Sequence, residues 1–171
     1  MTNIVKFDGT LYTKDKRRKN AHRPKTQQEE YAEWLESQNW SHWCTFTTTY
    51  ELSIKSARRL MQRFFDEIRF RGFNPTLFWV AEKFECRDAW HTHGLLKCNL
   101  RANEPYRFKQ ITHSYQHVCG AKVVPGTIRY NGWNRIELKH YDKAKGGAGL
   151  YCTKYVMKDQ NNQGAEYDLL I

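Results

Sequence analysis

The run Leu77-Phe-Trp-Val-Ala-Glu-Lys83 predicts a β-strand, and the run His91-Thr-His-Gly-Leu-Leu-Lys-Cys98 predicts a second one. A polar connection that contains Arg87 and Asp88 joins the two runs. Because consecutive strands with a short connection can pair side by side, an antiparallel pair is the simplest arrangement. This pair is the centre around which the other predicted elements are placed.

Further strands and helices are predicted on both sides of this pair. Trp43 to Thr49 is rich in β-branched and aromatic residues, which favours a strand. Thr26 begins a capping box, and apolar residues at helical spacing predict helices over Ile54–Ile68 and Pro105–Val118. Alternation over Ile136–His140 predicts another strand. The order of elements predicts an α+β fold, with a central antiparallel β-sheet and helices packed on it.

Composition indicates a polyanionic partner. The 171 residues suffice for one domain, and 28 Lys plus Arg against 18 Asp plus Glu give a formal charge of +10. Nucleic acid is the first expectation and an anionic membrane surface the second, because basic surfaces gain affinity by releasing counterions. Aromatic residues make up 15% of the chain, and some of them could stack on unpaired bases.

Several protein classes are disfavoured. The five cysteines are scattered and form no C-x-x-C pair, which argues against a disulfide framework or a zinc ribbon. No apolar run reaches the length of a membrane span, and the N-terminus lacks the apolar core of a signal peptide. A soluble protein in a reducing compartment is therefore expected.

The charge pattern predicts three parts of unequal length. Residues 1–25 carry seven basic residues against one acid from Lys14 onward and predict a mobile basic arm, which could grip phosphates or act as a nuclear localisation signal. Residues 26–159 are expected to form the folded domain. Residues 160–171 are expected to be a short, weakly structured tail.

A stripe of two tyrosines and two lysines lies in Tyr151-Cys-Thr-Lys154-Tyr155-Val-Met-Lys158, on a helix predicted to begin near Ala148. Residues spaced i, i+3, i+4 and i+7 share one helical face. A phenol oxygen can act as a nucleophile when a neighbouring ammonium group stabilises its negative charge. The stripe therefore indicates a phosphate-directed site, the alternative being a surface helix with solvated lysines.

The pair His91 and His93 forms a second candidate site. On a strand, residues i and i+2 point to the same face, so two imidazoles could bind one metal ion. Glu82 ends the preceding strand, where an antiparallel partner could supply a third ligand, and Glu85 in the connection is its rival. This donor set suits Mn²⁺, Mg²⁺, Zn²⁺ or Fe²⁺, and a phosphate substrate favours the first two. Structural histidines at a core or sheet edge are the alternative.

Together these motifs resemble those of the HUH endonucleases, specifically the rolling-circle replication initiators of single-stranded DNA viruses, phages and plasmids. The resemblance covers about Trp43 to Asp159 and consists of a Phe-Thr-rich strand, a His-x-His strand preceded by Glu, and the downstream Tyr-x-x-Lys-Tyr-x-x-Lys helix. It implies a sheet of RRM-like or palm-like topology. The implied roles are a DNA-contacting first motif at Phe46 to Thr49, metal ligation by His91, His93 and Glu82, nucleophiles at Tyr151 and Tyr155, and accompanying lysines at Lys154 and Lys158.

Two features depart from the family pattern. The residue between the histidines is usually bulky and apolar, whereas here it is Thr92, whose β-branching still suits a strand. Many relatives carry a helicase domain, but this sequence contains no Walker G-x-x-x-x-G-K-[ST] motif. Unwinding is therefore expected to come from a partner or from supercoiling.

The resemblance implies an endonuclease that uses Mn²⁺ or Mg²⁺ to nick single-stranded DNA at an origin, through a 5′-phosphotyrosyl intermediate, and later rejoins the strand. The expected partners are an origin hairpin and a host or viral helicase and polymerase, in the cytoplasm of a bacterial or archaeal host or the nucleus of a eukaryotic one. Tyr155 is slightly favoured as the indispensable nucleophile. Alternatives are a single-strand transposase or relaxase, a noncatalytic nucleic-acid-binding module and, least favoured, a two-His-one-carboxylate iron oxygenase.

Overall fold

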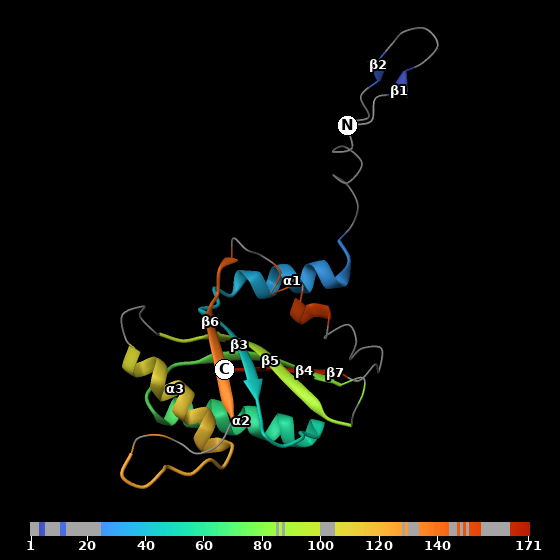
Figure 1. Cartoon of the computed structure of the whole chain (residues 1–171). Helices are drawn as coiled ribbons and strands as arrows, with labels where there is room; N and C mark the ends of the chain where they lie inside the picture. Colours follow the sequence, from blue (N-terminus) through green and yellow to red (C-terminus); the bar gives the residue numbers. More distant parts are fainter. Residues whose placement is uncertain are drawn as a thin grey trace.

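The structure is a computed structural model that describes residues 4–5, 11–12, 25–84, 86, 88–99, 105–127, 129, 134–143, 147, 149, 151–154 and 165–171. Three helices and seven strands are assigned within these residues (Figure 1). The helices are α1 (Gln27–Ser37), α2 (Ile54–Phe70) and α3 (Pro105–Val118). The strands are β1 (Ile4–Val5), β2 (Leu11–Tyr12), β3 (His42–Thr47), β4 (Thr76–Lys83), β5 (Trp90–Lys97), β6 (Arg135–His140) and β7 (Ala165–Leu170).

Five of the strands form one sheet in the order β6-β3-β5-β4-β7, with every neighbouring pair antiparallel. The α+β class, the antiparallel sheet and the packed helices predicted from the sequence are confirmed. The strands β4 and β5 are adjacent as expected, with Glu82 opposite His91 and Val80 opposite His93. The predicted strand pair thus lies inside the sheet, with β3 on one side and β7 on the other.

Strand β7 corrects the expectation of a weakly structured tail from Gln160. Residues Ala165–Leu170 pair with β4 and close one edge of the sheet. Tyr167 and Leu169 pack against one face, while Glu166 and Asp168 form ion pairs with Arg58 of α2. The sequence signal was a short apolar and polar alternation, weakened by Ala, Glu and Asp, which are poor strand formers.

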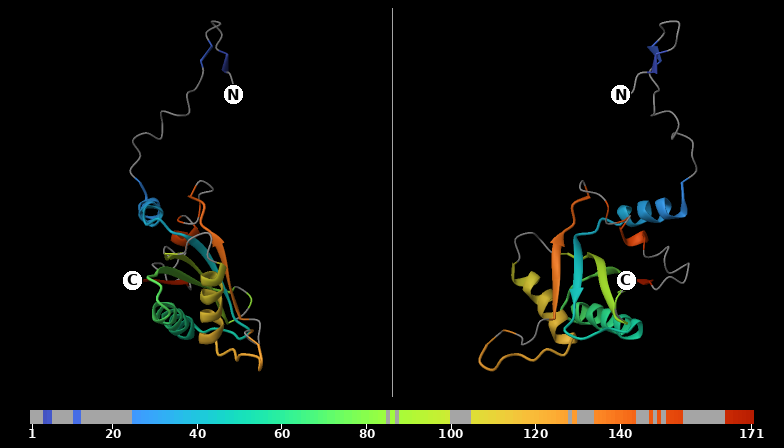
Figure 2. Two further views of the ribbon diagram at one scale, coloured as in Figure 1. Left: turned by 90° about the vertical axis from the view of Figure 1, so that its left-hand side faces the viewer. Right: turned by 45° about the vertical axis from the view of Figure 1, so that its right-hand side comes forward.

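The two faces of the sheet are covered by different helices (Figures 1 and 2). Apolar residues of α2 and α3 pack against one face, in a cluster that includes Phe46, Phe64, Leu77 and Tyr115. Leu35 of α1 belongs to a second cluster on the other face, which is completed by Trp40, Phe78, Val80, Leu95 and Cys152. Because successive strand residues point to opposite faces, each strand contributes to both clusters.

The helix termini follow the expected signals. Thr26 and Glu29 form the predicted capping box of α1, with Thr26 N–H donating to Glu29 Oε2 over 2.7 Å. Ser53 caps α2, and Gly72 follows that helix with a φ of 81°. These caps fix where α1 and α2 begin and where α2 ends.

The basic arm is described only in part. Ile4–Val5 pairs with Leu11–Tyr12 in a two-stranded antiparallel ladder, and the remaining residues of the arm lie outside the described part of the chain. Among the residues that are described, no helix combines the length and apolar character needed to cross a membrane.

Candidate active site

The strand register brings His91, His93 and Glu82 to one face of the sheet. His91 Nε2 lies 3.5 Å from Glu82 Oε2, across the ladder between β4 and β5. The rings of His91 and His93 have centroids 5.3 Å apart and stand almost perpendicular, at 86°. Glu82 therefore occupies the place predicted from the sequence, whereas its rival Glu85 lies outside the described residues.

These side chains are not closed into a ready-made metal centre. Within the residues that the structure describes, no three His, Cys, Asp or Glu side chains are gathered as a group that could hold an ion. The donor chemistry nevertheless fits a divalent cation, since two imidazoles and a carboxylate face one another on neighbouring strands. His93 Nδ1 is buried and has no hydrogen-bond partner in this part of the chain, as expected for a nitrogen reserved for a ligand.

Electrostatics keep one of these imidazoles neutral. Burial, and to a smaller extent the neighbouring His91, lower the pKa of His93 to about 4, against an opposing effect of the Glu82 carboxylate. His93 therefore carries no proton charge near neutral pH. A neutral imidazole is the form that binds a metal ion.

Tyr151 lies directly against this histidine. Residues 151–154 are helical, and the Tyr151 ring stands at 90° to the His93 ring, with centroids 5.6 Å apart. Lys154 is exposed on the same turn, while Tyr155 and Lys158 lie outside the described residues. The structure thus joins the two constellations that the sequence showed separately.

Trp43 of β3 completes the contact and was not singled out from the sequence. Its indole stacks on His93 with an interplanar angle of 24° and a centroid distance of 5.6 Å. Tyr151 meets the same indole edge-on, at 5.2 Å. The only sequence signal for Trp43 was its place in an alternating strand, with Thr45 and Thr47 on the same face.

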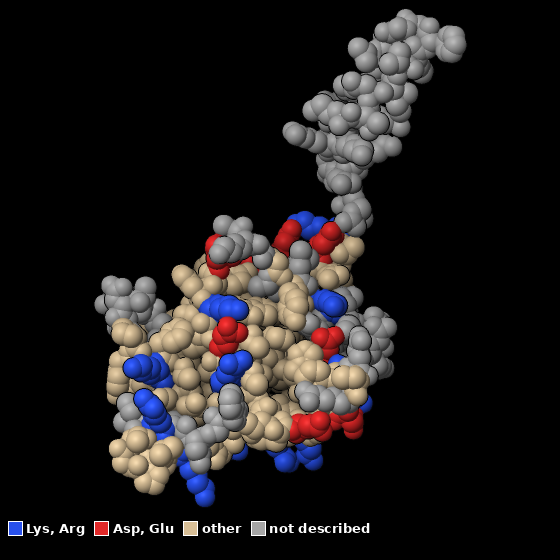
Figure 3. Space-filling view, viewed as in Figure 1, with Lys and Arg blue, Asp and Glu red and all other residues tan. Residues whose placement is uncertain are grey.

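The same face continues over β6. The ladder places Lys139 opposite Trp43, Glu137 opposite Thr45 and Arg135 opposite Thr47. Lys139 is 3.3 Å from Glu137, and charged side chains of both signs are exposed over this strand (Figure 3). Two exposed cations therefore lie one strand away from the row of threonines.

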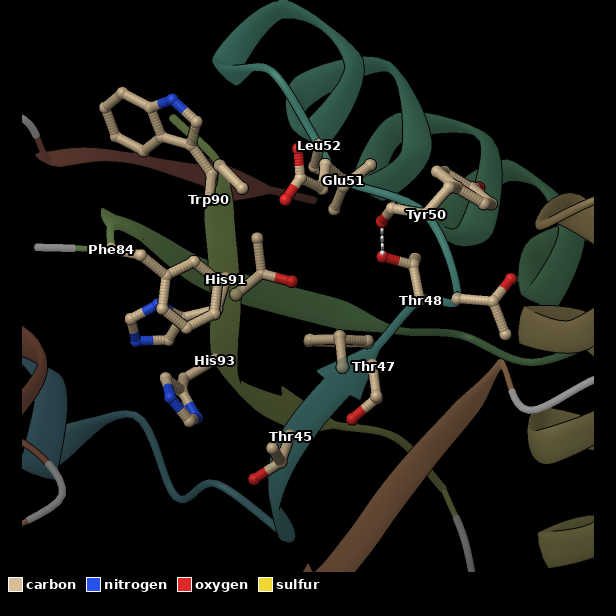
Figure 4. Close-up of a pocket in the computed structure, with 14 residues that line it drawn as sticks. Thr45, Thr47, Thr48, Tyr50, Glu51, Leu52, Phe84, Trp90, His91 and His93 are labelled. Carbon is tan, nitrogen blue, oxygen red and sulfur yellow. Dashed lines mark hydrogen bonds between the residues drawn. The ribbon is translucent and has the colours of Figure 1, made fainter. Parts of the chain in front are cut away.

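A pocket of about 250 Å³ opens between the end of β3 and the start of β5 (Figure 4). His91 and His93 line one side, and residues Thr45 to Tyr50, which include the predicted first motif, line the other. Asn134 holds this wall in place by accepting a 2.8 Å hydrogen bond from the Thr49 backbone. None of the lining residues is Lys or Arg, so the pocket is polar without being basic.

The remaining histidine candidates and Thr92 lie elsewhere. His113 and His117 are on α3, which packs on the opposite face of the sheet, in agreement with a surface or packing role. Thr92 alternates with the two histidines and is 1% exposed, and its Oγ1 has no hydrogen-bond partner among the described residues. Its β-branched side chain is accommodated in the strand as expected.

Comparison with known proteins gives one match. A family model for replication-associated proteins of the ORF2 type matches residues 41–160, well over half of the 171-residue chain. This range runs from β3 through the histidine pair to the tyrosine helix, and it leaves out α1 and β7. No curated protein and no solved structure matches the chain.

Proposed function

Because the chain belongs to this family of ORF2-type replication-associated proteins, we propose that it initiates DNA replication by nicking single-stranded DNA at an origin and later rejoining the strand. The contact between Tyr151 and His93 carries the proposal, since it joins a nucleophile to a candidate phosphate-activating group. The chemistry would be that of the HUH endonucleases.

In the first step the Tyr151 Oη would attack the phosphorus of the scissile phosphodiester. A P–O bond to the tyrosine forms and the bond between phosphorus and the 3′ oxygen breaks. The phenolic proton is lost and the leaving oxygen gains one, which yields a 5′-phosphotyrosyl protein and a free 3′-OH. The 3′-OH can prime synthesis, and its return attack rejoins the strand without ATP because the covalent link conserves the bond energy.

The three facing side chains would hold a divalent ion, Mn²⁺ or Mg²⁺. His91 and His93 would contribute ring nitrogens and Glu82 would contribute carboxylate oxygen. The bound ion would supply Lewis-acid neutralisation of the charge that develops on the phosphate. Trp43 would keep the Tyr151 ring over His93 while the substrate strand binds.

The substrate strand would lie across β6 and β3. Exposed Arg135 and Lys139 on β6, with Lys154 beside Tyr151, are suited to phosphates. The pocket between β3 and β5 has no cation but contains Tyr50, Phe84 and Trp90 in its wall, which suits a base better than a phosphate.

The two tyrosines would divide the work. Tyr151 would make the first attack, because its ring contacts His93. Tyr155 would make the second, four residues along the chain on the predicted helical face.

The test uses random single-stranded oligonucleotides labelled at the 3′ end, incubated with the protein and Mn²⁺. We expect a labelled adduct that survives denaturation, and sequencing of the attached fragments will give the recognised origin. Tyr151→Phe should abolish the first adduct, the double variant with Tyr155→Phe should abolish all of it, and chelation of the metal should do the same. Tyr106→Phe, at a residue 72% exposed on α3, is the matched control.

The same experiment separates the competing functions. DNA binding without any adduct would favour a noncatalytic binding module and would overturn the proposal. Joining of two transposon-like ends, in place of nicking and resealing at one site, would indicate a transposase. An adduct that persists in the double tyrosine variant would exclude tyrosine as the nucleophile.

A further inference from the structure

Glu36, near the end of α1, bridges two segments that are distant in sequence. Its Oε1 accepts a 3.0 Å hydrogen bond from the backbone N–H of Gly149, and its Oε2 accepts a 2.5 Å hydrogen bond from the hydroxyl of Tyr141. Gly149 precedes Tyr151 by two residues, and Tyr141 follows β6 directly. One carboxylate therefore ties the start of the tyrosine helix to the sheet.

The close approach of α1 requires glycine in this turn. A Cβ at Gly149 would lie 2.8 Å from Glu36 Oε1 and 2.9 Å from the carbonyl oxygen of Ala32. Gly147 has a φ of 92°, and its carbonyl accepts a 2.6 Å hydrogen bond from the N–H of Tyr151. The first turn is thus shaped by one glycine and docked against α1 at the other.

Apolar contacts reinforce the same junction. Leu35 of α1 and Cys152 of the tyrosine turn are both fully buried and belong to one cluster. Trp40 joins this cluster, and its indole N–H donates to the Leu35 carbonyl over 2.6 Å. The flanks of Tyr151 are therefore fixed by Glu36 on one side and by Cys152 on the other.

Both polar partners are held in the form that the junction needs. Burial raises the pKa of Tyr141, and the hydrogen bond and charge of Glu36 raise it further, so the phenol stays protonated and donates. The pKa of the Cys152 thiol is also raised, chiefly by burial and then by the charge of Glu36. A neutral thiol suits an apolar contact.

We propose that Glu36 is a positioning residue, which anchors the tyrosine helix on α1 so that the Tyr151 ring is held over His93 and Trp43. This role rests on the function proposed above. It assigns a task in the reaction to α1, which lies outside residues 41–160 covered by the family model. Glu36 itself contacts the turn and not the reacting atoms.

The test compares Glu36→Ala, which removes both hydrogen bonds, with Gly149→Ala, which drives the turn away from α1. Three quantities are measured: the single-turnover rate of adduct formation, the affinity for the oligonucleotide and the rate at which maleimide labels each cysteine. A misplacement of about 1 Å can reduce a rate by roughly 100-fold, so we expect losses of about 10- to 100-fold in adduct formation with unchanged affinity. Cys152 should become labelled while Cys44, equally buried in β3, stays protected.

Two further variants distinguish positioning from general stability. Glu36→Gln retains an oxygen for the Gly149 N–H and an amide that can donate to the Tyr141 oxygen, so it should recover most of the rate. Glu33→Gln removes an exposed charge from the same helix and should behave like the wild type.

Each other outcome contradicts the proposal. Protection of Cys152 in both Glu36→Ala and Gly149→Ala would show that no anchor was lost. Exposure of Cys152 with an unchanged rate would show that the anchor does not position Tyr151. Labelling of Cys44 together with Cys152 in every variant would make Glu36 a residue that supports the whole fold. Absence of an adduct in the wild type would instead overturn the proposed endonuclease, while Cys152 labelling would still report on the anchor.

Discussion

The two faces of the sheet use the same strands for different purposes. On the face covered by α2 and α3, Phe46, Phe64 and Tyr115 form an aromatic cluster with centroids 5.3 to 5.7 Å apart. On the other face, α1 and the tyrosine turn cover only part of the surface and leave His93 and Thr45 beside a polar pocket. One face stabilises the scaffold, and the other gives up apolar contact for groups that can bind a substrate.

Removal of an aromatic ring from the packed face should have the largest effect on stability. Phe64 is fully buried between Phe46 and Tyr115, and Phe64→Ala should cost about 3–5 kcal/mol in the free energy of unfolding. Phe70→Ala on the same helix, at a residue 88% exposed, should change it by less than about 0.5 kcal/mol. Urea unfolding checks both, and a loss under about 1 kcal/mol for Phe64→Ala would mean that this face is not the main core.

Removal of a site histidine should have the opposite profile. His93→Ala should reduce adduct formation at least about 100-fold, because charge stabilisation by a bound metal contributes several kcal/mol to such a step. Its effect on the free energy of unfolding should be much smaller than that of Phe64→Ala, since His93 is only partly buried. His117→Ala, at an exposed residue of α3, is the control for both measurements. A His93→Ala protein that unfolds as readily as Phe64→Ala would erase the distinction between the faces.

The packed face was the easier of the two to predict from the sequence. Helical spacing of apolar residues over Ile54–Ile68 gave α2, and alternation gave β5 with both histidines on one side. Local patterns suffice there because the period of the apolar residues sets which face is buried. The same alternation also placed Glu82 close to the histidines, once β4 and β5 were paired.

The site face depended on contacts that no local pattern carries. Glu36 and Gly149 are separated by 113 residues, and nothing in either segment indicates the other. Trp43 resembled any aromatic residue of a strand until the fold placed it between His93 and Tyr151. Strand β7 required a free edge of β4, which is a property of the assembled sheet. Such features follow from tertiary packing, which overrides weak local propensity.

A titratable group at the margin of the packed face provides a smaller test. His42 lies against Phe108 of α3, and burial, followed by the charge of His140, lowers the pKa of His42. The unfolded chain therefore binds the proton more tightly, so stability should be highest above about pH 6.5 and decline as the pH falls below it. The pH dependence of urea unfolding should be shallower in His42→Phe than in the wild type. Equal slopes would show that the packed face does not impose a desolvation cost on His42.

The smallest expected effect concerns Thr92, where the polar character of the site strand crosses to the packed face. Its buried Oγ1 has no hydrogen-bond partner within the described residues, so Thr92→Val should leave the free energy of unfolding unchanged or raise it by up to about 1 kcal/mol. Ser114→Ala is the comparison, because the equally buried Ser114 hydroxyl donates to Gln110 O over 2.8 Å and its loss should cost about 0.5–1.5 kcal/mol. Opposite signs in the two variants would show that partnership of the hydroxyl, and not burial alone, decides the outcome. A loss above about 1 kcal/mol in Thr92→Val would instead mean that a bound water satisfies this hydroxyl, and the packed face would then be wet beside the histidines.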